Sequence, residues 1–371
     1  MISTGRDICS PSQPRPRRSD FAHSPLIVFY EVTRACDLVC RHCRACAQPS
    51  CDPNELSPEL SRRLLDQLAE FPKPPMLVLT GGDPLKRDDI YELVEYATGR
   101  GLSVAVTPSA TPLVTGRALW RLKEAGMQRL ALSLDGADAK THDATRGVRG
   151  SFERTLQILA NARASRIPVQ INTTLTPENY CQIEAMAALL AEQRIVLWSV
   201  FFLVPIGRAA GGNRLSPRQY EGAFEKLYKQ ALLRQYGIKT TEAPQYRRYV
   251  IEQQKRRREV SKAVLPDSKL RLLGVNDGKG VMFISHTGMI HPSGFMPIVC
   301  GVFPLENVVR VYQKSEIFCG LRDASRLQGK CGVCEYRHIC GGSRARAYAV
   351  TGDPYAGEPD CDFTPAALRK P

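Results

Sequence analysis

The chain has 371 residues, of which 43% are hydrophobic, so it is long enough to bury a large core and to form two domains. Its 51 Lys and Arg residues exceed its 37 Asp and Glu residues, and the formal net charge of +14 favours anionic partners. No apolar run is long enough to span a bilayer or to serve as a signal peptide, so we expect a cytoplasmic protein with no membrane span. No aromatic residues are interleaved with the basic clusters, which argues against a nucleic-acid partner.

Residues 1–24 are rich in Pro, Ser and Arg, and we expect them to form a disordered tail. Short runs of Val, Ile and Leu follow, separated by stretches of helical length. The expected strands are residues 26–32, 76–80, 102–107, 129–134, 168–175 and 195–204. Strands that are apolar on both faces and alternate with helices are typical of a parallel sheet. We therefore predict an α/β fold in which residues 25–213 form a partial (β/α)6 barrel with its site at the carboxyl ends of the strands.

The rest of the chain divides by its helix signals and its composition. Helices are expected to begin at Ser57 and Thr176, where an N-cap residue precedes a proline. A capping box at Ser216 opens residues 214–273, which we expect to form a helical bridge. Residues 274–371 are rich in Gly and Cys, and we expect them to form a second, cysteine-rich domain.

Three cysteines follow the first expected strand at close spacing: Cys36, Cys40 and Cys43. Three thiolates can hold three irons of a [4Fe–4S] cluster and leave the fourth iron open to another ligand. An open iron is a place for chemistry, whereas a fully ligated cluster mainly transfers electrons. The spacing therefore predicts a cluster with one open iron.

Glycines and polar residues lie at the ends of later strands. Gly81 and Gly82 end the second strand, where they let the backbone approach a ligand closely. Their carbonyls and the carboxylate of Asp83 can accept hydrogen bonds from a protonated amino group, although the same residues also make a good turn. Four further candidates for the site are His42, Ser133, Arg146 and Asn172. Each of them is also compatible with an ordinary structural or surface role.

A second group of cysteines lies near the carboxyl end of the chain: Cys331, Cys334, Cys340 and Cys361. Four thiolates would close a [4Fe–4S] cluster and leave no iron free, so its role would be to conduct or accept electrons. The same spacing suits a zinc ion. The first cysteine motif favours iron here. The cysteines to which the sequence assigns no role include Cys46, Cys51, Cys300 and Cys319.

The two motifs together resemble the radical SAM superfamily with a C-terminal SPASM- or twitch-like Fe–S domain. The resemblance is strongest to the branch that contains the heme synthase of the alternative heme pathway and the heme d1 radical SAM protein. It is carried by residues 31–38, 42–45, 80–84, 204–210, 283–288, 331–336, 340–342 and 344–348.

The resemblance implies cofactors and site residues. S-adenosylmethionine (SAM) would bind the open iron and be reductively cleaved to a 5′-deoxyadenosyl radical that abstracts hydrogen from the substrate. A reductase, or a flavodoxin or ferredoxin, would donate the electron. The implied SAM contacts are His42, Gly81, Gly82, Asp83, Ser133, Arg146 and Asn172.

The resemblance also implies a choice of substrates for an oxidoreductase- or lyase-type enzyme. One is a tetrapyrrole whose propionates lose their carboxyl groups; the alternative is a peptide that is crosslinked through a thioether or a carbon–carbon bond, or decarboxylated. A full SPASM domain would carry a cysteine where this chain has Met282, and the heme-synthase-like proteins carry cysteines where it has Ser293 and Ser343, so we expect one auxiliary [4Fe–4S] cluster and not two. A further alternative is a non-enzymatic zinc or Fe–S protein.

Overall fold

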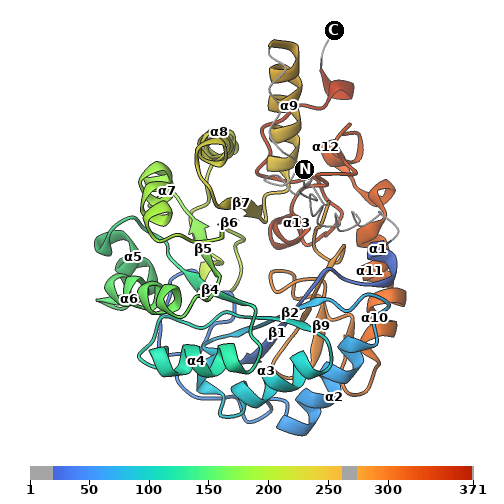
Figure 1. The fold of residues 1–371 in the computed structure, drawn as a ribbon. Helices are drawn as coiled ribbons and strands as arrows, with labels where there is room; N and C mark the ends of the chain where they lie inside the picture. The colour runs from blue at the N-terminus through green and yellow to red at the C-terminus, as the bar shows by residue number, and fades with distance from the viewer. Residues whose placement is uncertain (1–19, 261–273, 370–371) are drawn as a thin grey trace, which may run out of the picture.

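The computed structural model describes residues 20–260 and 274–369 (Figure 1). The expectation of a disordered tail lies outside the described residues for positions 1–19. For the end of that range it is wrong, because α1 (Asp20–His23) is helical. Phe21 is buried, and its carbonyl oxygen accepts a hydrogen bond from the Tyr312 hydroxyl at 2.7 Å. This contact anchors the beginning of the described chain to its carboxyl-terminal part.

The six strands expected for the barrel are all present, and each pairs in parallel with the next. They are β1 (Ile27–Thr33), β2 (Met76–Gly81), β3 (Ser103–Val106), β4 (Arg129–Ser133), β5 (Val169–Leu175) and β6 (Leu197–Phe202). A parallel strand is covered on both faces, so its sequence is a nearly continuous apolar run that is easy to find. The α/β prediction is therefore confirmed.

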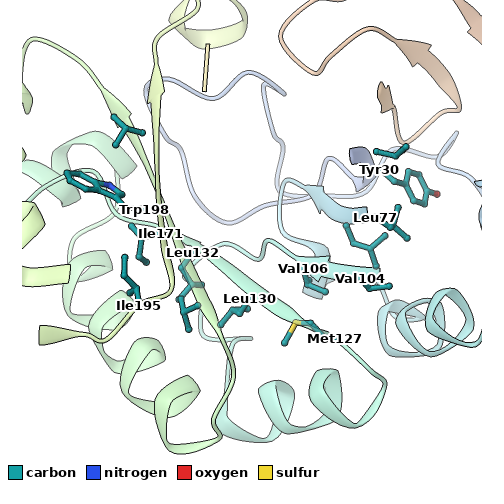
Figure 2. Close-up of a cluster of buried hydrophobic side chains, with 14 of the residues drawn as sticks. Tyr30, Leu77, Val104, Val106, Met127, Leu130, Leu132, Ile171, Ile195 and Trp198 are labelled. Atoms are coloured by element: carbon teal, nitrogen blue, oxygen red, sulfur yellow. The ribbon is translucent and has the colours of Figure 1, made fainter. Parts of the chain in front are cut away.

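Helices cover the outer face of these strands (Figure 1). They are α2 (Pro58–Ala69), α3 (Ile90–Gly99), α4 (Gly116–Glu124), α5 (Ala139–Arg146), α6 (Ser151–Ala164) and α7 (Ile183–Glu192). Alternate strand side chains point toward these helices and form the core, among them Leu77, Leu132 and Trp198 (Figure 2). The residues between them point to the inner face of the sheet, where a site can form.

Of the two expected helix starts, the structure confirms one and contradicts the other. Ser57 caps α2, since its hydroxyl accepts a hydrogen bond from the backbone N–H of Leu60 at 3.2 Å. At Thr176 the prediction is wrong, because α7 begins only at Ile183. The side chain of Asn179 accepts from the Thr176 backbone N–H and donates to the Asp135 carbonyl oxygen, both at 2.9 Å. This buried amide ties the segment to the end of β4 and holds it as a turn.

The expected helical bridge contains a strand. The capping box at Ser216 opens α8 (Pro217–Leu233) as predicted, but β7 (Gly237–Thr241) follows before α9 (Gln245–Val260). β7 pairs in parallel with β6 and so continues the barrel. Its sequence, with a lysine and two threonines, contains no apolar run, which is why the pattern missed it.

The carboxyl-terminal part continues the same sheet. β8 (Val281–Ile284) pairs in parallel with β1, and β9 (Met289–His291) and β10 (Gly301–Val302) follow as antiparallel strands. The strand order is β10-β9-β8-β1-β2-β3-β4-β5-β6-β7, so β10 and β7 are the edges and the barrel is not closed.

Short helices complete the fold after β10. The α-helices are α10 (Val308–Lys314), α11 (Glu316–Arg322), α12 (Gly329–Gly332) and α13 (Arg344–Thr351). The 3-10 helices of the described residues are η1 (Pro84–Lys86), η2 (Tyr180–Gln182), η3 (Gly207–Ala209), η4 (Ala324–Arg326) and η5 (Ala366–Leu368). Across residues 20–260 and 274–369, every helix is too short or too polar to cross a bilayer.

Candidate active site

The three cysteines of the first motif lie in the loop after β1 and pack into one small cluster with Leu38 and Ala47. Each sulfur lies within reach of a hydrogen-bond donor. The donors are the backbone N–H of Leu38 for Cys36 at 3.3 Å, the guanidinium of Arg146 for Cys40 at 3.6 Å, and the backbone N–H of Ala47 for Cys43 at 3.4 Å. Such donors can hydrogen-bond to a thiolate, which is the form that binds iron, although burial still raises the pKa of the Cys36 thiol.

An arginine that the sequence analysis did not single out holds this loop in place. Arg208 of η3 donates from Nη1 to the Cys40 carbonyl oxygen at 3.1 Å and from Nη2 to the Ala47 carbonyl oxygen. The loop also closes on itself where the Cys36 backbone N–H donates to the Gln48 carbonyl oxygen at 2.7 Å. Arg208 lies within a segment that carried the family resemblance, but its partners are distant in sequence.

The glycine pair at the end of β2 packs against the cysteine loop. A Cβ atom on Gly81 would lie 2.2 Å from the Thr33 carbonyl oxygen, and one on Gly82 would lie 2.3 Å from the Ala35 carbonyl oxygen. The backbone N–H of Gly82 donates to the Thr33 carbonyl oxygen at 2.9 Å. Only glycine allows the two segments to approach this closely. The glycines therefore position the cysteine loop, and their contact with SAM stays a prediction.

Asp83 is fully buried and caps η1. Its carboxylate accepts hydrogen bonds from the backbone N–H of Leu85 at 3.2 Å, the backbone N–H of Ser109 at 3.4 Å and the hydroxyl of Thr111 at 2.7 Å. Burial raises the pKa of this carboxyl group, and the three donors offset part of that rise. The structure thus gives Asp83 a structural role, and its contact with the SAM amino group stays a prediction.

Two of the predicted contacts lie next to each other on the inner face. Ser133 at the end of β4 is in register with Asn172 of β5, and both side chains are half-buried. The amide oxygen of Asn172 accepts a hydrogen bond from Gln170 at 2.7 Å. The structure therefore brings together two residues that are far apart in sequence at the carboxyl end of the barrel.

Arg146 and His42 meet at Asp135. The guanidinium of Arg146 lies 2.5 Å from the Asp135 carboxylate, and Nε2 of His42 lies 3.8 Å from the same oxygen. Burial lowers the pKa of His42 to about 4, so the ring is neutral near pH 7. Its Nδ1 is buried and has no hydrogen-bond partner in the described part of the chain. A buried polar atom without a partner marks a place where a ligand fits.

A charge cluster on the inner face of β1 was not predicted from the sequence. Glu31 accepts from Arg44 at 2.9 Å, and its other oxygen lies 2.8 Å from Nδ1 of His286. Burial by itself would raise the pKa of Glu31, but Arg44 and His286 outweigh it and the pKa is lowered. The Arg44 guanidinium also lies over the ring of Phe283 at 4.5 Å. Residues of the cysteine loop, β1 and the carboxyl-terminal part thus meet here.

The four cysteines of the second motif line one hollow. Three of the sulfurs accept backbone hydrogen bonds. The donors are the N–H of Glu358 for Cys331 at 3.3 Å, of Tyr336 for Cys334 at 3.4 Å, and of Gly342 for Cys340 at 3.4 Å. Burial raises the pKa of Cys340 to about 12 and that of Cys361 to about 11. These thiols therefore keep their protons until a metal displaces them.

Four thiols that line one hollow are a suitable donor set for a closed [4Fe–4S] cluster, and the same four thiols could instead hold one zinc ion.

The three positions at which the family resemblance implied further cysteines are engaged in other contacts in this structure. Met282 is fully buried in the core. The Ser293 hydroxyl accepts from the backbone N–H of Phe295 at 3.2 Å, and the Ser343 hydroxyl donates to the carboxylate of Glu242. None of the three side chains is a thiol that would hold iron. The cysteines without an assigned role, Cys46, Cys51, Cys300 and Cys319, are free in the structure.

Comparison with known proteins identifies the family. Residues 30–190 match the family described as "Radical SAM superfamily". The AdoMet-dependent heme synthase of Methanosarcina barkeri (strain Fusaro) is 37% identical over 92% of this chain and 98% of its own length. The chain belongs to the radical SAM superfamily. The pre-heme d1 synthase of Dinoroseobacter shibae is a more distant relative, 29% identical over 95% of this chain and 90% of its own length.

Solved structures show the same fold. SuiB of Streptococcus suis bound to S-adenosylmethionine has a TM-score of 0.71 at 18% identity, over 92% of this chain and 78% of that chain. The same protein has been solved with its precursor peptide SuiA. Membership of the superfamily makes this chain an enzyme that uses a [4Fe–4S] cluster and SAM. The non-enzymatic alternative is therefore wrong.

Proposed function

We propose that this radical SAM enzyme acts on a tetrapyrrole, as the name of its heme synthase relatives suggests, and that it removes carboxyl groups from the propionate side chains. The observation that carries the proposal is the 37% identity to the Methanosarcina barkeri enzyme over 92% of the chain. The net charge of +14 suits a substrate with several carboxylates. Both cysteine groups fit such a reaction. The first would hold the cluster at which SAM is cleaved, and the second would hold a cluster that accepts the electron released by the substrate.

The catalytic cluster and SAM are assigned to the carboxyl ends of β1, β2, β4 and β5. Cys36, Cys40 and Cys43 hold the cluster, and together with SAM it supplies the radical that abstracts hydrogen from the substrate. Backbone and guanidinium donors lie within hydrogen-bond reach of the three sulfurs and would orient them as ligands. Arg208 keeps the cysteine loop closed over this edge of the sheet.

The residues proposed to contact SAM differ in how strongly their surroundings favour a direct contact. The unpartnered Nδ1 of His42, and the half-buried pair Ser133 and Asn172, favour direct contacts. Arg146 and Asp83 already have protein partners, so we assign them to holding the Cys40 sulfur and η1. The carbonyls of Gly81 and Gly82 stay in the proposal as acceptors for the SAM amino group.

The second cysteine group is proposed to hold one closed auxiliary [4Fe–4S] cluster. The convergence of Cys331, Cys334, Cys340 and Cys361 on one hollow supports it. With four thiolate ligands no iron stays open, so this cluster serves as the acceptor for the electron that the substrate releases. An external reductase, flavodoxin or ferredoxin is proposed as the donor to the catalytic cluster. The cytoplasm is proposed as the location, because it keeps the thiols reduced.

Metal analysis after anaerobic reconstitution is the first test of the cofactors. We expect about 8 irons per chain, and about 4 in a Cys36→Ala variant or a Cys334→Ala variant. The matched control is Cys181→Ala, because this thiol is exposed and lies outside both groups. About 4 irons with one zinc in the parent protein would make the second site structural and contradict its role as electron acceptor.

Product analysis tests the substrate. A tetrapyrrole with free propionates should give 5′-deoxyadenosine, carbon dioxide and a product that has lost carboxyl groups. Cys334→Ala should keep part of the 5′-deoxyadenosine formation but lose the product. Full turnover by Cys334→Ala would show that the second cluster is not the acceptor. Turnover of a peptide in place of the tetrapyrrole would establish the alternative, a peptide maturase.

A further inference from the structure

A buried side chain near the second cysteine group lacks a partner within the described residues. Gln245, the first residue of α9, is only 2% exposed. Neither its amide nitrogen nor its amide oxygen forms a hydrogen bond in the described part of the chain. Burying an amide without hydrogen bonds costs free energy, so native structures rarely keep one without a bound group to complete it. The amide of Gln245 therefore needs a partner from outside the chain.

The position of Gln245 in the fold indicates which partner this is. Gln245 lines the same hollow as the four cysteines of the second motif, which is the proposed site of the second [4Fe–4S] cluster. Such a cluster presents sulfide and thiolate sulfurs, which accept hydrogen bonds. A glutamine amide nitrogen carries two N–H donors. The unpartnered amide thus offers the donors that the sulfurs of a cluster in this hollow accept.

Two cations that line the hollow already have partners in the protein. Arg248 pairs with Glu252 at 2.9 Å. The ammonium of Lys330 donates to the Cys361 carbonyl oxygen. These cations hold the walls of the hollow, whereas Gln245 keeps its donors free among the described residues.

The start of α9 is fastened to the segment of the second cysteine group (Figure 1). Nη1 of Arg247 donates to the Ile339 carbonyl oxygen at 3.0 Å. Just before α9, the carboxylate of Glu242 accepts a hydrogen bond from the Ser343 hydroxyl. The two contacts flank Gln245 on one segment and the third of the four cysteines on the other, so they keep the glutamine at the hollow. The amino-terminal end of a helix also favours negative charge beside it.

We propose that the side-chain amide of Gln245 donates a hydrogen bond to a sulfur of the second cluster and raises its reduction potential. The inference rests on the proposed function, because it takes the second cysteine group to hold that cluster. A cluster that accepts one electron becomes more negative, and a hydrogen-bond donor stabilises the more negative state more strongly. The electron comes from the substrate radical, which is oxidised as the cluster is reduced. Gln245 favours this transfer and takes no part in any bond that forms or breaks.

The test measures the reduction potential of the second cluster in the full chain with the Cys36→Ala change, which leaves this cluster as the expected iron site. Gln245→Met removes the donors and keeps the length of the side chain. At a fixed applied potential we expect the ratio of reduced to oxidised cluster to fall about tenfold, which corresponds to a reduction potential lower by about 59 mV for one electron. A redox titration followed by electron paramagnetic resonance measures it.

The matched control is Gln254→Met in the same Cys36→Ala protein. Gln254 lies on the same helix and is half-buried, but it does not line the hollow of the four cysteines. Its substitution should leave the reduction potential unchanged. A decrease of the same size in both variants would contradict a specific role for Gln245.

A second measurement detects the contact in the protein that retains Gln245. The Cys36→Ala protein is made by cell-free synthesis with glutamine that carries nitrogen-15 in its side-chain amide. Pulsed electron paramagnetic resonance of the reduced cluster should then show a coupling to nitrogen-15. Gln254→Met should keep this coupling, and Gln245→Met should lose it.

The outcomes separate this inference from the proposal on which it rests. Equal reduction potentials with and without Gln245→Met, or no nitrogen-15 coupling, would overturn the role of Gln245 and leave the second cluster in place. Zinc instead of iron in the Cys36→Ala protein would overturn the second cluster and the inference together. Both measurements are made without substrate, so their results do not depend on which substrate the enzyme uses.

Discussion

Arg208 shows how a single side chain can organise a loop that has little secondary structure of its own. Its guanidinium donates to two carbonyl oxygens of the cysteine loop, those of Cys40 and Ala47. A planar guanidinium fixes both acceptors at once, which a lysine cannot do. Other long-range hydrogen bonds also reach the loop, such as those from the Asp83 N–H to the Ala35 carbonyl oxygen at 2.7 Å and from the Arg41 N–H to the Thr145 carbonyl oxygen at 3.0 Å, but the Arg208 guanidinium joins two separate parts of the loop at once.

Replacing Arg208 should therefore weaken the catalytic cluster and leave the fold intact. We expect Arg208→Gln to lower SAM cleavage or cluster retention by about 10- to 100-fold, the range found when groups that orient metal ligands are removed. The measurement is iron content and 5′-deoxyadenosine formation. Arg218→Gln is the control, because Arg218 is exposed near the start of α8. A variant with normal iron content and activity would show that the loop holds its shape without Arg208.

His142 provides a prediction for acid stability. This residue of α5 is fully buried, and its Nδ1 accepts a hydrogen bond from the Asp135 backbone N–H at 3.0 Å. The ring proton therefore lies on Nε2, 3.2 Å from the hydroxyl of Ser151. Burial first, and then the charge of Arg146, lower the pKa of His142 to about 4. The folded protein thus keeps this histidine neutral, whereas the unfolded chain protonates it near pH 6.5.

The sign of the effect follows from this difference. His142 contributes stability above pH 6.5, and the contribution is lost as the pH falls toward 4, because only the unfolded chain gains a proton there. Between pH 7.5 and pH 5, the free energy of unfolding should fall by about 2 kcal/mol more in the parent protein than in His142→Gln. Urea unfolding at the two pH values measures it. The same pH dependence in both proteins would contradict the neutral assignment.

At the scale of elements, the end of β2 lies very close to the cysteine loop. This close approach can be tested by comparing two Gly→Ala substitutions. A Cβ atom on Gly82 would meet the backbone oxygens of Ala35 and Arg34 at 2.3 and 2.7 Å. Backbone atoms cannot move aside as a flexible side chain can. Gly82→Ala should therefore displace the loop that carries the three cysteines, with a cost to stability of about 1–3 kcal/mol and loss of the catalytic cluster.

The control for this variant is Gly99→Ala at the end of α3, where an added Cβ atom meets nothing within 4 Å. It should be neutral or slightly stabilising, since alanine is the better helix former. Thermal unfolding and iron content measured on both variants separate a local steric effect from a general sensitivity to substitution. An intact cluster in Gly82→Ala would show that the loop can shift without losing iron.

Sequence patterns predicted the elements whose signal is local. The six barrel strands were found because most of them are short, largely apolar runs, and β5 still carries an apolar residue at every second position except Thr173. β7 was missed because a lysine and two threonines leave it without an apolar run. The capping box at Ser216 was confirmed, whereas the signal at Thr176 was overridden by Asn179, whose bonds to distant backbone no local pattern contains.

The same distinction between local and distant signals applies to the residues of the site. The close spacing of its members made each cysteine group visible, and the structure places the members of each group together. The pairing of Glu31 with His286 joins residues 255 positions apart, and Arg208 reaches Cys40 from 168 positions away. These contacts depend on strand order, and strand order follows from the packing of the whole sheet.

At the scale of the whole molecule, the carboxyl-terminal part is built into the barrel. β8 lies between β1 and β9, so the strand next to the cysteine loop has one neighbour from each half of the chain. The side chains of Met282 and Ile284 are fully buried in the main core. The pair of Glu31 and His286 adds a buried polar link between the halves. The hydrogen bond from the Ser343 hydroxyl to the Glu242 carboxylate also joins the segment of the second cysteine group to the end of β7.

Opening of β8 should therefore require unfolding of the barrel. We expect the backbone amides of β8 to exchange with deuterium as slowly as those of β1, because separating the two strands exposes Met282 and Ile284 and leaves Glu31 without His286. Hydrogen-exchange mass spectrometry of the intact protein measures both strands in one experiment. The edge strand β10 serves as the internal reference and should exchange faster, since only one of its sides is paired. Exchange of β8 at the rate of β10, with β1 still protected, would mean that the carboxyl-terminal part opens as a separate unit.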